Sequence, residues 1–245
     1  MPNAMPPQGP VVIVGVGPGL GASLARRFAR GGLPVALVAR GAERLERIAA
    51  EVRNAGGQAL AVPGDAAVPA EVETAVRTVE NAFGPIGTLI YNAGNFVRGR
   101  LPELSIEAFE TAWRVGVHGA FLWARATVPG MIERGAGVIL FTGATSSVMA
   151  PAHGPAFAAA KFGLRGLALS LARDLGPKGI HVAHVIVDGV IDTPQTRAVL
   201  TDARDEEFLS PAAIADAYWY LAAQPRSAWS FELDLRPHVD DYLKN

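Results

Sequence analysis

The sequence predicts an α/β protein with one doubly wound parallel sheet of about seven strands and helices on both of its faces. Short runs of β-branched residues alternate with amphipathic segments along the whole chain. Several of these runs end at a glycine, a pattern typical of buried parallel strands that enter a turn. No internal repeat or linker divides the 245 residues. We therefore expect a flexible leader over residues 1–10 and a single domain over residues 11–245.

The first half of the chain contains three strand–helix units and a fourth strand. The run VVIVG is a short strand, and Leu20, Leu24 and Phe28 follow it at helical spacing until Gly31-Gly32 ends the helix. The later units repeat this order, and each amphipathic segment is closed by glycine or followed by the next apolar run. Strands are expected at residues 11–15, 34–40, 59–62 and 88–91, and helices at residues 19–30, 42–54 and 68–83.

The second half contains two long helices, which carry alanine and leucine on more than one face. Leu164, Leu167, Ala168 and Leu171 form a wide apolar stripe on the second of them. Either the sheet alone buries these helices, or they also pack against another copy of the chain. Helices are expected at residues 106–133, 155–175 and 211–223, and strands at residues 138–142, 180–187 and 231–235.

Composition excludes several classes of protein. Half of the residues are apolar and the net charge is -1, which offers no case for binding nucleic acid or an acidic membrane surface. There is no cysteine, and no His, Asp or Glu cluster has the spacing of metal ligands, so we expect no metal. No apolar stretch is long enough to cross a membrane, and residues 1–10 lack the features of a signal peptide. A cytoplasmic protein is expected.

A glycine-rich segment follows the first strand and opens the first helix. Glycines there let the backbone turn tightly and approach a pyrophosphate, and the helix N-terminus supplies free N–H groups. A tight turn without a ligand is the alternative, but the strand–glycine–helix context favours a Rossmann-type dinucleotide site. The expected contacts come from Gly15, Gly17, Gly19, Leu20 and Gly21.

Arg40 follows the second strand, where an NAD enzyme usually places a carboxylate for the ribose 2′-hydroxyl. A guanidinium at this point suits a 2′-phosphate, so the sequence favours NADP(H) over NAD(H). The alternative is a solvated arginine at the start of a helix.

Motifs at the ends of later strands match one family when taken together. Asp65 ends the third strand, Asn92-Ala93-Gly94 follows the fourth, and Asp188-Gly189 with Thr193 follows the sixth. With Gly15/Gly19/Gly21 and the segment that begins at Lys161, they make the chain resemble the short-chain dehydrogenases/reductases from Val11 to about Pro237. The resemblance implies a homodimer or homotetramer formed through the helices at 106–133 and 155–175. It also implies further cofactor contacts from Asp65, Ala66, Asn92, Ala93, Gly94, Thr142, Lys161, Gly189, Val190 and Thr193.

The same resemblance implies a catalytic tetrad of Asn, Ser, Tyr and Lys, of which this chain keeps one member. Lys161 matches the lysine, which holds the nicotinamide ribose and lowers the pKa of the tyrosine. Phe157 stands at the position of the tyrosine, Ala144 at that of the serine and Gly116 at that of the asparagine. A phenyl ring cannot donate the proton that a phenol donates.

Other side chains offer proton-transfer groups near the expected site. The hydroxyls of Thr142, Thr145, Ser146 and Ser147 follow the fifth strand, and they either orient a substrate or bond the backbone of their own loop. His153 and Tyr91 are also in the right region, but we do not assign them as catalytic. The remaining histidines, His118, His181 and His184, are interpreted as packing residues.

Two functions remain open from the sequence. One is an NADP(H)-dependent oxidoreductase that transfers a hydride to or from a small carbonyl, imine or alkene without the usual Ser and Tyr. The other is a non-catalytic NADP(H)-binding protein that acts as a sensor or a partner subunit. The charged segment between Thr193 and Pro211 is expected to cover the substrate, but it does not identify one.

Overall fold

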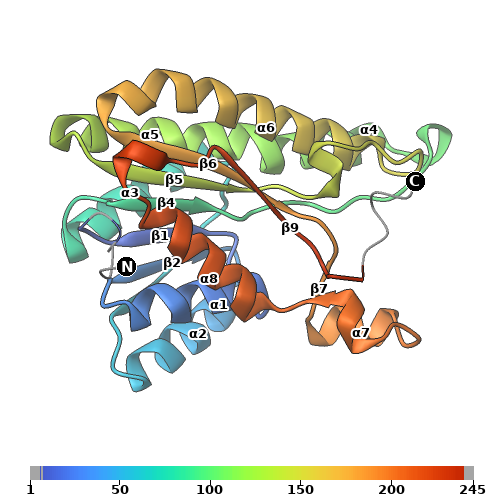
Figure 1. Ribbon diagram of the computed structural model, residues 1–245, viewed down its shortest axis with the longest axis horizontal. Helices are drawn as coiled ribbons and strands as arrows, with labels where there is room; N and C mark the ends of the chain where they lie inside the picture. The colour runs from blue at the N-terminus through green and yellow to red at the C-terminus, as the bar shows by residue number, and fades with distance from the viewer. Residues whose placement is uncertain (1–5, 7, 240–245) are drawn as a thin grey trace.

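The computed structural model describes residue 6 and residues 8–239, and most of the predicted leader lies outside these residues. Its main feature is a seven-stranded parallel sheet in the order β3-β2-β1-β4-β5-β6-β9 (Figure 1). The order reverses between β1 and β4, which is the point where ligands bind in sheets of this kind. The strands are β1 Val11–Val14, β2 Val35–Ala39, β3 Ala59–Pro63, β4 Thr88–Tyr91, β5 Gly137–Thr142, β6 Ile180–Val187 and β9 Glu232–Leu235.

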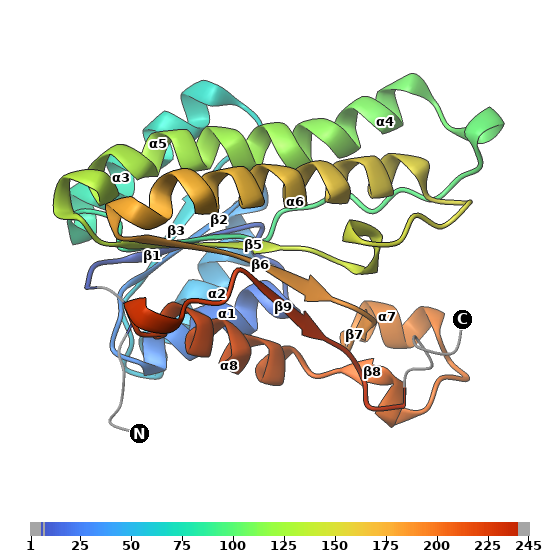
Figure 2. The ribbon, with the colours of Figure 1, turned by 45° about the horizontal axis from the view of Figure 1, so that its top comes forward.

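Helices cover both faces of the sheet, as the sequence predicts (Figure 2). One layer consists of α1 (Leu20–Arg30), α2 (Ala42–Asn54) and α8 (Pro211–Ala222). The other layer consists of α3 (Pro69–Phe83), α4 (Ile106–Trp113), α5 (Gly119–Arg134) and α6 (Pro155–Leu175). Strand β1 shows why the core has two halves, because Val11 and Ile13 pack into one buried cluster while Val12 and Val14 pack into the other.

A small unit lies beyond the carboxyl end of β6. It contains the short strands β7 (Val190–Ile191) and β8 (Phe208–Leu209), which pair in parallel, and the helix α7 (Pro194–Val199) between them. The sequence predicted a substrate-covering segment here but did not predict the two strands. Their pairing ties this segment to the end of the sheet where the predicted site residues lie.

The prediction of one long helix at 106–133 is wrong in one respect, because a π turn at Arg114–His118 separates α4 from α5. The backbone N–H of Gly119 donates to the carbonyl of Arg114, five residues back. Within this wider turn, the carbonyl of Val115 accepts a hydrogen bond of 2.5 Å from the hydroxyl of Tyr91. Gly116 packs so closely on α6 that a Cβ atom there would lie 2.9 Å from the Cβ of Ala160.

The other predicted boundaries agree with the structure to within one residue. Helix α1 begins at Leu20, with Gly19 as its cap, and β9 begins at Glu232. No helix within the described part of the chain is long and apolar enough to cross a membrane.

Candidate active site

The carboxyl ends of the central strands open into a continuous cleft. One part has a volume of about 700 Å³ and another of about 390 Å³, and both are lined by Gly15, Gly17, Asn92 and Gly94. Every predicted cofactor residue except Gly19 lines one of the two parts. Gly19 instead faces the side chain of Thr193, whose Cγ2 would lie 2.6 Å from a Cβ at that position.

The glycine loop is shaped by close backbone contacts. Gly15 has a φ of 89°, and a Cβ there would lie 2.4 Å from the backbone nitrogen of Ala93, so no other residue fits. The Asn92 side chain donates a hydrogen bond of 2.8 Å to the Gly15 carbonyl and holds this approach. Gly17 has nothing within 4 Å of its Cβ position. The loop is therefore tight at Gly15 and open at Gly17, just before the N-terminus of α1.

Two arginines lie at the smaller part of the cleft. Arg40 follows β2 and Arg44 lies in the first turn of α2, and both line this part together with Asp65 and Ala66. Neither guanidinium has an ion pair with any residue that the structure describes. Sequence reasoning identified Arg40 but missed Arg44. The signal available for Arg44 was its place four residues further on, in the first turn of the next helix.

Asp65 is held by its own loop. Its side chain accepts a hydrogen bond of 2.9 Å from the backbone N–H of Ala67, and its backbone N–H donates one of 2.7 Å to Glu71. This arrangement leaves the carboxylate fixed at the wall of the smaller part of the cleft.

Lys161 projects from α6 toward the cleft and is almost completely buried, with 5% of its surface exposed. Its ammonium group donates a hydrogen bond of 2.7 Å to the carbonyl of Thr142, at the end of β5. Burial lowers the pKa of Lys161 to about 8. The lysine is therefore positioned by one backbone acceptor and has further N–H groups to offer a ligand.

Two phenyl rings form the wall beside Lys161. The Nζ atom of Lys161 lies over the Phe157 ring, 5.5 Å from its centre. The Phe157 ring meets the Phe96 ring edge to face, with their centres 5.0 Å apart. The guanidinium carbon of Arg98 lies over the Phe96 ring, 5.3 Å from its centre. We call these four side chains, Lys161, Phe157, Phe96 and Arg98, the aromatic row.

The tetrad positions differ in where they lie. Phe157 and Ala144 both line the larger part of the cleft, as Lys161 does. Gly116 is buried against α6 and lines neither part. The side chains at the first two positions carry no group that donates a proton.

The hydroxyls that follow β5 mostly have partners. The Thr142 hydroxyl shares a hydrogen bond of 2.6 Å with the Tyr218 hydroxyl, and the Ser147 hydroxyl accepts one of 3.1 Å from the Ala144 backbone. Thr145 donates to the buried carboxylate of Asp188, which also pairs with Arg236 at 3.3 Å. Only Ser147 therefore bonds the backbone of its own loop, while Thr145 and Ser146 line the cleft. The Thr145–Asp188 contact was not predicted.

His153 lines the cleft, as Arg98 does, and its carbonyl accepts a hydrogen bond of 3.0 Å from the backbone N–H of Gly99.

Tyr91 is fully buried, and burial, together with the charge of Asp65, raises its pKa above the ordinary value. His184 is also buried, with Nδ1 3.1 Å from Glu232, and desolvation lowers its pKa to about 4. Tyr91 and His184 are thus packing residues, which is the sequence interpretation of His184 and removes Tyr91 from the candidate proton donors.

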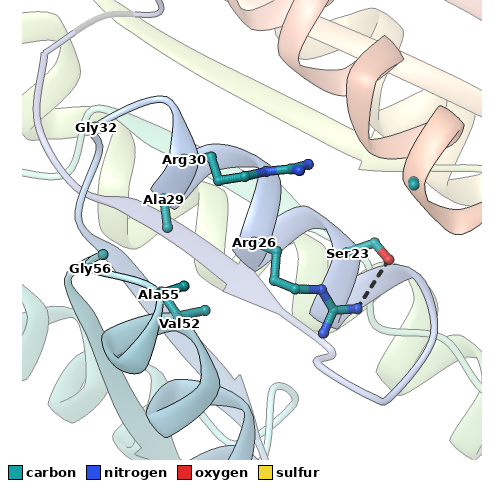
Figure 3. A pocket seen from close by; sticks show the side chains of 10 residues that line it. Ser23, Arg26, Ala29, Arg30, Gly32, Val52, Ala55 and Gly56 are labelled. Atoms are coloured by element: carbon teal, nitrogen blue, oxygen red, sulfur yellow. Dashed lines mark hydrogen bonds between the residues drawn. The ribbon is translucent and has the colours of Figure 1, made fainter.

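A separate groove of about 620 Å³ lies between α1 and α2 (Figure 3). In it, Arg26 donates a hydrogen bond of 3.5 Å to Ser23 and pairs with Glu51 at 3.2 Å. The groove contains none of the predicted site residues. Within the described ranges, no group of three His, Asp or Glu side chains is placed to hold a metal ion.

Comparisons with known proteins agree with this architecture. The model of the family described as short chain dehydrogenase matches residues 10–204, so the chain belongs to the short-chain dehydrogenase/reductase family. An uncharacterized oxidoreductase of Staphylococcus epidermidis is 26% identical over 92% of this chain and 96% of that protein. The 2-(R)-hydroxypropyl-CoM dehydrogenase of Xanthobacter autotrophicus is 31% identical over 87% of this chain and 90% of that protein. The chain is accordingly an oxidoreductase of the nicotinamide-dependent kind.

Solved structures show the same fold over nearly the whole chain. A short-chain dehydrogenase from Rhodopseudomonas palustris superposes with a TM-score of 0.82 at 37% identity, covering 94% of this chain and 98% of that one. A metagenomic short-chain oxidoreductase in complex with NADP superposes with a TM-score of 0.82 at 27% identity, covering 97% of this chain and all (100%) of that one.

Proposed function

We propose that this protein transfers a hydride between NADP(H) and a small carbonyl, imine or alkene substrate, with Lys161 as the one tetrad residue that it keeps. The observation that carries the proposal is the placement of Lys161 at the cleft, held by the Thr142 carbonyl and flanked by Phe157 and Ala144. When bound, the cofactor supplies the hydride donor or acceptor. The protein's own residues bind it, orient the substrate and exclude water.

The preference for NADP(H) rests on Arg40 and Arg44. Both guanidiniums line the smaller part of the cleft without an ion-pair partner among the described residues, and two cations there suit the 2′-phosphate of NADP(H). Two of the similar structures were solved with this cofactor, the metagenomic oxidoreductase with NADP and an L-sorbose reductase of Gluconobacter frateurii with NADPH.

We infer the substrate class from the proton donors that are absent at Phe157 and Ala144. Reduction of a ketone places a negative charge on oxygen, which needs a proton, and neither Phe157 nor Ala144 provides one. Hydride addition to a protonated imine instead gives a neutral amine, because the electron pair of the C=N bond moves to the positively charged nitrogen. Positioned acid–base catalysis contributes ~10²–10⁴ in rate, whereas orientation of two reactants contributes ~7–11 kcal/mol and does not depend on a phenol.

The test is consumption of NADPH against a panel of ketones, preformed cyclic iminium ions and enones, by the wild type and by Lys161→Ala. We expect the largest kcat/KM for the iminium ions, and a loss of turnover in Lys161→Ala. Wild-type rates in Lys161→Ala would contradict the role of the lysine. Binding of NADPH with no turnover of any compound would instead identify a non-catalytic NADP(H)-binding protein.

We also propose that the chain forms a homodimer or homotetramer through α4, α5 and α6, which lie side by side on one face of the sheet (Figure 2). Large apolar side chains remain exposed on all three helices, among them Trp113, Phe121 and Phe162. A second copy that covers them is the expected partner. The cytoplasmic location remains a prediction from the sequence.

A further inference from the structure

Arg98 is the charged residue of the cleft that the proposed hydride transfer does not use. It lies in the loop after β4 and lines the larger part of the cleft with Phe96, Met149 and His153. It does not line the smaller part, where Arg40 and Arg44 lie. Arg98 is therefore at the substrate end of the cleft, away from the end assigned to the cofactor phosphate.

The guanidinium of Arg98 is free to bind a ligand. It lies over the face of Phe96, and it has no hydrogen bond or ion pair with any residue that the structure describes. Stacking on a ring leaves the in-plane N–H groups of an arginine available, in a fork that matches a carboxylate. The loop itself is anchored, because the backbone N–H of Gly99 donates a hydrogen bond of 3.0 Å to the carbonyl of His153.

The charge of the lining is one-sided. The larger part of the cleft is lined by the cations Arg98 and Lys161 and, among the described residues, by no Asp or Glu. The wall between the two cations is apolar, since Phe96 and Phe157 lie between Arg98 and Lys161 in the aromatic row. The row thus presents a cation at the mouth, an apolar surface, and then Lys161 at the reacting end.

We propose that Arg98 binds the carboxylate of the substrate, and that the substrate is an organic acid whose apolar or aromatic body lies along Phe96 and Phe157. The reducible group of this acid then lies beside Lys161, and its carboxylate balances the positive charge that an iminium group would bring into the cleft. A single guanidinium with apolar neighbours matches one negative charge, which favours a carboxylate over a doubly charged phosphate. This inference rests on the proposed function, because it assigns the substrate of the same cleft.

The experiment measures binding by calorimetry, with and without saturating NADP⁺, so that it does not require turnover. The probes are phenylacetate, its neutral counterpart phenylacetamide, and benzylphosphonate. We expect phenylacetate to bind at least about tenfold more tightly than phenylacetamide, the ratio that a charge-assisted pair supplies. Arg98→Gln should remove this ratio, and Arg98→Lys should restore part of it.

Arg100→Gln is the matched control, because it makes the same change of charge two residues away on the same loop, at a side chain outside the cleft lining. It should keep the tenfold ratio. Equal affinities for the acid and the amide, absence of binding by both, or a ratio unchanged in Arg98→Gln would overturn the proposal. Tighter binding of benzylphosphonate would overturn the assignment of a carboxylate. Failure of NADP⁺ itself to bind, seen in the same titrations, contradicts the proposed function, while the comparison without cofactor still tests Arg98.

Discussion

The ammonium group of Lys161 lies over the face of the Phe157 ring, one helical turn away on α6. The two residues are i and i+4 on the helix and share the face that lines the cleft. Phenylalanine and tyrosine have the same ring, so the site keeps the shape that a tyrosine would give it. What is missing is one oxygen atom and its proton.

Phe157→Tyr should therefore raise the rate of carbonyl reduction by NADPH, by about 10²-fold, because it adds a phenol beside a cation that favours its ionised form. Steady-state kinetics on a simple ketone checks the prediction, and addition of Ala144→Ser should increase the gain. Phe96→Tyr is the control, since its ring lies one step further from Lys161 and should give no increase. An unchanged rate in a Phe157→Tyr protein that still binds NADPH would contradict this account.

Lys161 makes stability depend on pH. Its pKa is lowered from 10.5 to about 8 in the folded state. Between these pH values the unfolded chain binds more protons than the folded one, so the free energy of unfolding rises with pH. Below pH 8 both states are protonated and the cost of burying the charge is present in full.

Lys161→Met removes that charge while it keeps a side chain of similar length. We expect this variant to be more stable than the wild type at pH 7, by about 2 kcal/mol after loss of the hydrogen bond to Thr142, and to lose the advantage by pH 10.5. Urea unfolding at several pH values measures the difference. Lys178→Met, at an exposed ion pair with Asp174, should show no such trend. A difference for Lys161→Met that is independent of pH would be the contrary result.

Arg40 and Arg44 should set the choice between the two nicotinamide cofactors. Replacing both with alanine should weaken NADPH binding by about 10- to 100-fold and leave NADH binding nearly unchanged, because only NADPH carries a phosphate for them. Fluorescence titration with each cofactor gives the two dissociation constants. Arg47→Ala, on the same helix but outside the cleft lining, is a suitable control. Equal losses for both cofactors would argue against a 2′-phosphate site.

Tyr91 and Gly119 are coupled by close contact. A Cβ at Gly119 would lie 2.2 Å from the Tyr91 hydroxyl and 2.8 Å from the carbonyl oxygen of Ala66, so Gly119→Ala should destabilise the protein by about 1–3 kcal/mol. The loss should be smaller in a Tyr91→Phe background, and a double-mutant cycle from denaturant unfolding measures the coupling. Gly130→Ala in the same helix meets only the end of the Arg134 side chain, 3.3 Å away, and should be nearly neutral. Independent effects of the two substitutions would show that the contact carries no energy.

The exposed apolar face of α4, α5 and α6 should control the oligomeric state. Phe162→Asp places a charge on this face, where the wild-type side chain is 42% exposed, and should convert the oligomer to monomers without unfolding it. Light scattering after size-exclusion chromatography gives the mass of each species. Tyr220→Asp, at an exposed aromatic residue on α8 in the opposite layer, should leave the mass unchanged. A monomeric wild type would contradict the proposed interface.

Most of the fold could be predicted because its strands are buried on both faces and therefore appear as continuous apolar runs, such as Val11–Val14. The break between α4 and α5 could not, because it depends on contacts between distant segments. The Tyr91 hydroxyl comes from β4 and Ala160 from α6, and neither leaves a periodic signal near residue 116.

The candidate site also contains some residues whose positions could be predicted from the sequence and others whose positions could not. Residues that directly follow a strand, such as Asn92 and Gly189, could be placed because parallel strands bring their carboxyl ends to one edge. Arg98 lies in an irregular loop, and its position relative to Phe157 depends on how that loop folds back. The contact between Gly19 and Thr193 could not be predicted either, because it joins segments that are far apart in the chain.

The hydrogen bond from Tyr91 to the π turn connects two regions that are otherwise far apart in the chain. Tyr91 directly precedes the Asn92 loop of the cleft, and Val115 belongs to the helix whose outer face is exposed and apolar. A displacement of Tyr91 or of Val115 would therefore strain the hydrogen bond between them. In the proposed assembly, this hydrogen bond would therefore join the wall of the cleft to the helices that form the interface.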